Sequence, residues 1–170
     1  PCNDVIVLER TFDVKGSIYI NGYDGDDIIK IGGDNTNNGV DSIFKTVYTF
    51  GGEGENTLIV NDSTSSLSKT EVVLDGGSLL QILNGLNDTS SDLSYENFDT
   101  ITLLLSNTSA TVLAVTSTLE GSMTNVYAGD EKDVIFVNET QGDILIHGGG
   151  GDDIFYFTGL GDNATANIYG

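Results

Sequence analysis

Cysteine and histidine are almost absent from this chain. Cys2 is the only cysteine, so a disulfide within the chain is excluded, and the fold cannot be a small scaffold held by disulfides. Two interpretations of Cys2 stay open, an incidental buried thiol or a partner for a cysteine elsewhere. One histidine and one cysteine far apart in the sequence cannot build the tetrahedral site that zinc prefers, so zinc is not expected.

Basic residues and long apolar runs are also scarce. The chain has 6 Lys and Arg residues against 26 Asp and Glu residues, which gives a formal net charge of -20. Nucleic acids and anionic membrane surfaces need a basic face and are therefore poor partners, whereas cations are natural ones. No apolar run approaches the ~20 residues of a membrane helix, so we expect no membrane insertion.

Enzyme chemistry finds little support in this composition. A solenoid that cleaves acidic polysaccharides would need a basic groove, and the six basic residues are scattered along the chain. His147, the single histidine, is expected to be an ordinary residue at a strand end. Acidic residues occur everywhere, so a pair of carboxylates carries no information about glycosidase activity. We therefore expect no enzymatic function.

Glycine is abundant, and it marks an internal repeat. The chain has 22 Gly and one Pro in 170 residues, so its turns are glycine turns. A glycine turn, one or two acidic residues and an apolar β-branched run follow one another in residues 148–157, and in weaker form in residues 22–29, 51–60 and 128–137. Seven anchor positions directly precede a short apolar run: Asp4, Asp27, Asn56, Ser78, Ala110, Asp133 and Asp153.

Each repeat contains two short apolar runs and no segment of helical periodicity. This pattern predicts an all-β fold, a parallel β-solenoid (β-helix or β-roll-like) of about seven two-stranded coils with no substantial helix. The alternative is an antiparallel β-sandwich of roughly 12 to 14 short strands. Residues 1–170 are expected to form a single solenoid module. Residues 84–98 fit the repeat worst and are expected to be a loop or insertion.

The best copy of the turn has a family resemblance. Residues 148–156 match the calcium-binding nonapeptide G-G-x-G-x-D-x-U-x, with Asp153 at the aspartate position. The chain resembles a divergent relative of the haemolysin-type (RTX-like) calcium-binding repeats, and more loosely the glycine-aspartate repeats of giant extracellular adhesin-like proteins. The resemblance implies that turn carbonyls and aspartates of adjacent coils hold Ca²⁺ between them.

The residues to which the calcium hypothesis applies form two groups. The candidate metal ligands are Asp4, Asp24, Asp27, Asp130, Asp133 and Asp153. The turn glycines are Gly22, Gly25, Gly148, Gly149 and Gly151. Stacked coils would bring like charges within roughly 5 Å, where a cation between them relieves the repulsion. The glycine turn occurs once per repeat here, so we expect the acids along one edge of the solenoid only. The alternative is that these acids are simply solvated on exposed turns.

Five N-glycosylation sequons are present, at Asn61, Asn87, Asn107, Asn138 and Asn163. Asn61 and Asn138 each fall five residues after an anchor, which places both at one phase of the repeat. We expect glycans on a secreted eukaryotic protein, the alternative being a surface that is merely rich in Asn, Ser and Thr.

These observations predict a structural module of an extracellular or cell-surface protein: a filament, matrix or adhesin segment, with calcium as a candidate stiffening ion. Because the chain opens without a methionine and both ends look like halves of one glycine turn, we expect a piece of a longer solenoid. It would continue by covalent tandem copies or by homotypic end-to-end association. The alternative function is a calcium-dependent carbohydrate- or surface-binding module of a secreted enzyme. Four tyrosines at one strand phase could supply an exposed aromatic column or an internal stack: Tyr19, Tyr48, Tyr127 and Tyr169.

Overall fold

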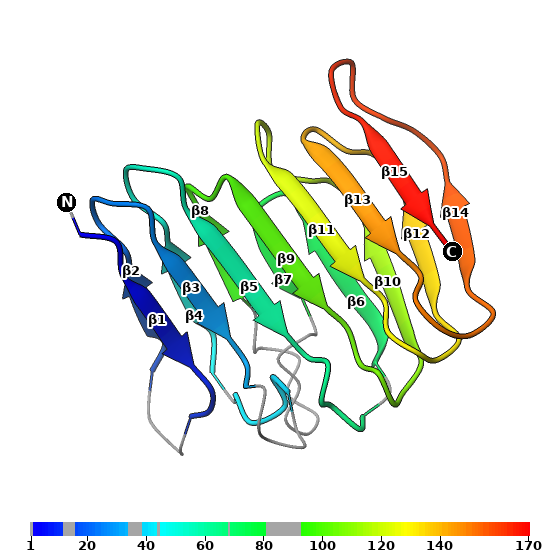
Figure 1. The fold of residues 1–170 in the computed structure, drawn as a ribbon, viewed down its shortest axis with the longest axis horizontal. Helices are drawn as coiled ribbons and strands as arrows, with labels where there is room; N and C mark the ends of the chain where they lie inside the picture. Colours follow the sequence, from blue (N-terminus) through cyan, green and yellow to red (C-terminus); the bar gives the residue numbers. More distant parts are fainter. Residues whose placement is uncertain (1, 12–15, 34–38, 44, 68, 81–92) are drawn as a thin grey trace.

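Two β-sheets that face each other make up the fold (Figure 1). The computed structural model describes residues 2–11, 16–33, 39–43, 45–67, 69–80 and 93–170. In this part of the chain the regular elements are fifteen strands, and no helix occurs. None of the described residues lies in a helix with the length and hydropathy that a membrane crossing needs.

Sheet A has seven strands and sheet B has eight. The strands of sheet A, in spatial order, are β1 (Val5–Leu8), β3 (Ile28–Ile31), β5 (Thr57–Asn61), β9 (Thr100–Leu104), β11 (Met123–Tyr127), β13 (Asp143–His147) and β15 (Ala166–Tyr169). The strands of sheet B, in spatial order, are β14 (Ile154–Phe157), β12 (Val134–Val137), β10 (Thr111–Val115), β6 (Lys69–Asp75), β7 (Ser78–Leu80), β8 (Leu93–Glu96), β4 (Val47–Phe50) and β2 (Ile18–Asn21).

The core lies between the sheets and follows the two-residue period of a strand. In β13, for example, Ile144 and Ile146 are buried, while Leu145 between them faces outward and is half-buried. The parallel registers put like positions next to each other, so that Ile146 pairs with Val126 of β11. Repetition of this pairing along both sheets builds one continuous apolar core.

The predicted parallel β-solenoid of about seven two-stranded coils is wrong. The structure is a sandwich-like pair of sheets, and sheet B is mixed because β7 runs antiparallel to both β6 and β8. The antiparallel sandwich considered as the alternative is wrong as well. Apart from the two pairings of β7, every pairing between the described strands is parallel.

A hairpin between β6 and β7 is the physical reason for this difference. Sequence reasoning placed an anchor at Ser78, as if Gly76 and Gly77 made another turn between coils. Instead these two glycines link β6 to β7 within one sheet, with Asp75 paired to Ser78. A Gly-Gly pair between two apolar runs is a common hairpin signal, and Gly77 has a φ of 145°. Of the predicted loop or insertion at 84–98, residues 84–92 lie outside the described part, and Leu93–Glu96 form strand β8.

The turns between the sheets lie along two opposite edges. At the first edge the chain passes from sheet B to sheet A, as in residues 22–27 and 51–56. At the second edge it passes from sheet A to sheet B, as in residues 128–133 and 148–153. The glycine-acid turns therefore change edge between the two halves of the chain, and the prediction that they lie along a single edge is wrong.

Candidate functional site

The acids of the first edge form a ladder of hydrogen bonds, which we call the first ladder: Asp4, Asp27, Asn56 and Asp99. The backbone N–H of Asp4 donates to Oδ1 of Asp27 at 2.8 Å, and the N–H of Asp27 donates to Oδ1 of Asn56 at 2.9 Å. The N–H of Asn56 donates in turn to Oδ2 of Asp99 at 2.8 Å. The side chains of Asp27, Asn56 and Asp99 thus each receive the backbone N–H of the preceding ladder member.

A second ladder runs along the second edge and consists of Thr111, Asp133 and Asp153. The N–H of Thr111 donates to Oδ1 of Asp133 at 2.6 Å, and the N–H of Asp133 donates to Oδ1 of Asp153 at 2.9 Å. Asp133 is fully buried, as Asp27 is in the first ladder. In both ladders one carboxylate oxygen therefore satisfies a backbone donor that the turn would otherwise leave unpaired.

The second oxygen of the buried aspartates has no such partner. Oδ2 of Asp27 and Oδ2 of Asp133 are buried and make no hydrogen bond. Asn56 occupies the same position in the first ladder, and there the side-chain Nδ2 donates to the carbonyls of Gly52 at 3.4 Å and Gly54 at 3.3 Å. An asparagine therefore completes a set of contacts that an ionised aspartate cannot make, because a carboxylate only accepts.

Burial raises the pKa of Asp133 to about 6. The N–H of Thr111 opposes this shift, while the charges of Asp153 and Glu131 add to it. The carboxyl of Asp133 consequently holds a proton more readily than an ordinary aspartate does. A proton or a cation bound to Oδ2 of Asp133 would take the position that the Nδ2 group occupies in Asn56.

The structure brings only some of the predicted metal ligands together. Asp4 lies next to Asp27 and Asp133 lies next to Asp153, as the repeat predicted. Asp24 and Asp130 are exposed at the surface of their turns. Across the described ranges, no three or more His, Cys, Asp or Glu side chains are grouped so that they could hold a metal ion. A calcium site here would need backbone carbonyls as well as the carboxylates.

The turn glycines are required by the close stacking of successive turns. Gly149 has a φ of 87°, and a Cβ there would overlap the carbonyl oxygen of Gly129 in the neighbouring turn. At Gly25, with a φ of 138°, a Cβ would overlap the carbonyl of Cys2. A Cβ would also overlap a neighbouring turn at Gly22 and Gly151, whereas at Gly148 it would meet the side chain of Asp153 in its own turn.

Sequence reasoning missed Asp99, which fills the first ladder after Asn56. The repeat assigned this place to Ser78, because the hairpin of β6 and β7 interrupts the regular spacing. A signal was nonetheless present, since Asp99 directly precedes the apolar run of β9 in the same way as Asp27 precedes β3. At Ala110, another of the predicted anchors, the following residue Thr111 continues the second ladder through its backbone N–H.

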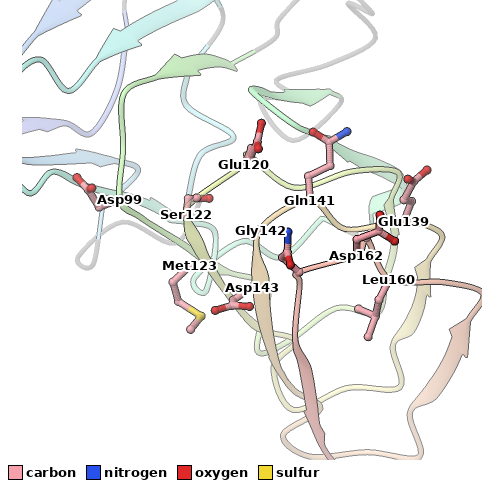
Figure 2. Close-up of a pocket in the computed structure, with 13 residues that line it drawn as sticks. Asp99, Glu120, Ser122, Met123, Glu139, Gln141, Gly142, Asp143, Leu160 and Asp162 are labelled. Atoms are coloured by element: carbon pink, nitrogen blue, oxygen red, sulfur yellow. The ribbon is translucent and has the colours of Figure 1, made fainter.

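An acidic groove of about 750 Å³ lies along the first edge in the second half of the chain (Figure 2). Its carboxylates come from several turns and comprise Asp99, Glu120, Glu139, Asp143 and Asp162. Asp143 accepts bonds from the hydroxyl and the N–H of Thr165, and these bonds lower the pKa of Asp143. Apart from Asp99, its acids follow no ladder and were not predicted. Their weak signal is an acid next to a glycine, as in Glu120-Gly121 and Gly161-Asp162.

Stacked aromatic rings lie on the outer faces of both sheets. Tyr127, His147 and Tyr169 form one stack on sheet A, with ring centroids 4.9 and 5.1 Å apart. Tyr19 and Tyr48 stack at 4.9 Å on sheet B, so the four tyrosines do not form one column. Tyr19 is 71% exposed and Tyr169 is 54% exposed, which rules out the internal stack. The rings of Phe136 and Tyr156 form a further pair on sheet B.

The predicted glycosylation sites differ in accessibility. Asn107, Asn138 and Asn163 are exposed, and Asn87 lies outside the described residues. Asn61 is 1% exposed, and its Oδ1 accepts bonds from the N–H and the hydroxyl of Ser63. A glycan on Asn61 does not fit this fold, because strand β5 buries that side chain. Cys2 is exposed, so its interpretation as a buried thiol is wrong.

Comparison of the chain with protein-family models, with curated proteins and with solved structures finds no match.

Proposed function

We propose that this chain is a structural module of an extracellular or cell-surface assembly that extends by adding further copies at its ends. The observation that carries the proposal is that the outermost strands of both sheets have unpaired edges. β1 and β2 leave open edges at one end of the two sheets, and β15 and β14 do so at the other (Figure 1). Open edges with unpaired N–H and C=O groups are templates for another strand.

Inward-facing apolar side chains at the end formed by β14 and β15 support association of this end with another copy. Ile168 pairs in register with Ile146, which is fully buried, yet Ile168 itself is 39% exposed. Phe157 likewise pairs with the buried Val137 and is 41% exposed. These side chains have the orientation of core residues but lack the next layer that would cover them.

The experiment is a sedimentation analysis of the chain over a range of concentrations, with two charge-matched variants of β15. Ile168→Lys places a charge on the inward face and should weaken association by tenfold or more. Asn167→Lys adds the same charge on the outward face of the same strand and should leave association unchanged. Equal behaviour of both variants, or a chain that stays monomeric at every concentration, would refute the proposal.

Calcium enters this proposal as a stiffening ion for the two ladders. The buried Oδ2 atoms of Asp27 and Asp133 lack partners, and Asn56 indicates that turn carbonyls lie within reach of this position. Carboxylate and carbonyl oxygens are the ligands that Ca²⁺ prefers. An ion there would tie one turn to the next.

A second candidate function rests on the outer aromatic stacks. Exposed aromatic rings suit the apolar faces of sugars, so the exposed Tyr127 and Tyr169, which stack on either side of His147, favour a carbohydrate- or surface-binding module. Binding to insoluble polysaccharides that is lost in Tyr169→Ala, with the end association intact, would favour this function over the structural one.

A further inference from the structure

A buried cluster of one lysine and two aspartates lies at the second edge, where Lys69 pairs in register with Thr111, the first residue of the second ladder. Lys69 is the first residue of β6, Asp62 directly follows β5, and Asp41 lies between β3 and β4. The three residues are 5%, 0% and 7% exposed, respectively. The Lys69 Nζ lies 2.6 Å from Oδ1 of Asp41 and 2.8 Å from Oδ2 of Asp62.

This cluster is poorly satisfied as a set of ions. One buried ammonium faces two buried carboxylates, and removing such charges from water is costly unless each is paired and hydrogen-bonded. Asp41 is well held, because it accepts bonds from Lys69 and from the hydroxyl of Ser65. Asp62 is not: its Oδ1 receives only a long bond of 3.3 Å from the N–H of Val40. Its Oδ2 has the distance of an ion pair to Lys69 but not the alignment of a hydrogen bond.

Burial raises the pKa of Asp62 to about 6, and the charge of Asp41 adds to the shift while Lys69 opposes it. An amine attacks the carbon of a protonated carboxyl far more readily than that of a carboxylate, because the protonated group carries no negative charge and its hydroxyl can leave as water. Asp62 is therefore suited to react at its carbon.

We propose that Lys69 and Asp62 condense to an intramolecular amide bond within the folded chain, with Asp41 as the general base. Transfer of one proton from the ammonium of Lys69 to the carboxylate of Asp62 turns the ion pair into an amine and a carboxylic acid, and a buried site without water favours such uncharged groups. Nζ then attacks Cγ of Asp62, Asp41 accepts the proton that Nζ loses, and the same proton passes to the departing hydroxyl of Asp62.

The reaction is balanced without any further reactant. The bond between Nζ and Cγ forms, one bond between Cγ and a carboxyl oxygen breaks, and one molecule of water leaves. The ammonium and the carboxylate are replaced by a neutral amide, and Asp41 keeps its negative charge. Ordering of the amine against the carboxyl supplies the high effective concentration that such condensations need.

The amide would tie the end of β5 in sheet A to the start of β6 in sheet B. In sheet B, β7 and β8 lie between β4 and β6, so the chain passes both of them on its way from β5 to β6. The crosslink would fix this connection, which the other repeats do not share. The inference is independent of the proposed end-to-end association.

Intact mass under denaturing conditions tests the proposal directly. The chain is produced in a bacterial host to avoid glycans, and its fold is checked by circular dichroism before the measurement. We expect a mass lower than the sequence mass by one water molecule. A folded chain with the full sequence mass would overturn the proposal.

Trypsin then identifies the acceptor. Without a crosslink, cleavage after Lys30, Lys45 and Lys69 releases residues 31–45, 46–69 and 70–132 as separate peptides. An amide between Lys69 and Asp62 blocks cleavage at Lys69 and gives a single peptide 46–132 that has lost one water. A bond to Asp41 would instead join residues 31–45 to that peptide, which would contradict the assignment of Asp62.

Two variants separate the base from the nucleophile. Lys69→Arg keeps the positive charge and cannot condense, so its mass should equal its sequence mass. Asp41→Asn keeps the size of the side chain but removes the base, and we expect the uncondensed mass in freshly folded protein. Full condensation of Asp41→Asn would refute the role of Asp41. If either variant fails to fold, the wild-type mass and digest still decide.

Discussion

The backbone N–H of Asp27 donates to Oδ1 of Asn56, 2.9 Å away in the next turn of the first ladder. Asn56 also donates from its Nδ2 to two carbonyls of its own turn, so both ends of its amide are used. Asp133, at the corresponding place of the second ladder, uses one oxygen and leaves the other unpaired. The comparison of these two positions leads to the first two predictions.

Asp133→Asn should remove a pH dependence from the stability. The pKa of Asp133 is about 6 in the folded chain against an ordinary value of 3.8, so the folded chain binds this proton more tightly than the unfolded chain. The stabilising contribution is fully present below pH 3.8 and is lost as the pH rises through 6, and it amounts to roughly 3 kcal/mol. Urea unfolding at pH 4.5 and 7.5, compared between wild type and variant, should measure about 2 kcal/mol of it, because pH 4.5 lies above the unfolded value of 3.8.

At pH 7.5 we expect Asp133→Asn to be at least as stable as the wild type, because the amide supplies the donor that the carboxylate lacks. Asp133→Ala serves as the control. It loses the bond from Thr111 and should be less stable by about 1–2 kcal/mol. Parallel pH profiles for wild type and Asp133→Asn would show that folding does not raise the pKa of Asp133, which would contradict the prediction.

Calcium should stabilise the wild-type chain. An ion bound only by the folded state contributes about 2.7 kcal/mol at a hundredfold excess over its Kd. We expect thermal melts in calcium and in chelator to differ, and the difference to shrink in Asp133→Asn. Asp162→Asn is the matched control, because it removes one charge from the acidic groove and none from the ladders. Superimposable melts would reject the calcium hypothesis, and a loss confined to Asp162→Asn would move the ion to the groove.

Two glycine substitutions separate backbone strain from steric overlap. Gly121 and Gly149 both have positive φ, 76° and 87°, but a Cβ on Gly121 meets open space whereas one on Gly149 meets the carbonyl of Gly129. Gly121→Ala should cost about 1 kcal/mol for the conformation alone. We expect Gly149→Ala to cost clearly more, since the turns would have to move apart. Chemical denaturation of both variants gives the comparison, and equal costs would mean that the turns are not closely stacked.

Local sequence signals were sufficient for the strands and for most of the ladder residues. Short apolar runs mark β13 and β14, and an acid before a strand marks Asp27, Asp133 and Asp153 because the ladder bond requires that position. These features depend on neighbours within a few residues along the chain.

The sheet in which a strand lies, and its direction there, could not be predicted in the same way. Gly76 and Gly77 permit positive φ both in a turn that reverses the chain within one sheet and in a turn that leads to the other sheet. An alignment of the repeats therefore cannot distinguish the hairpin from a turn between sheets. For the same reason, the alignment could not show that Asp27 lies at the first edge and Asp133 at the second. The cluster of Lys69 with Asp41 and Asp62 joins residues up to 28 positions apart, and no motif relates them.

Small-angle X-ray scattering at rising protein concentration tests the central claim, the growth of the module at its ends. We expect the particle to lengthen while its cross-section stays constant, because copies add at the open edges of β1 and β15. A particle of fixed length at all concentrations, or one that grows in cross-section, would contradict the claim.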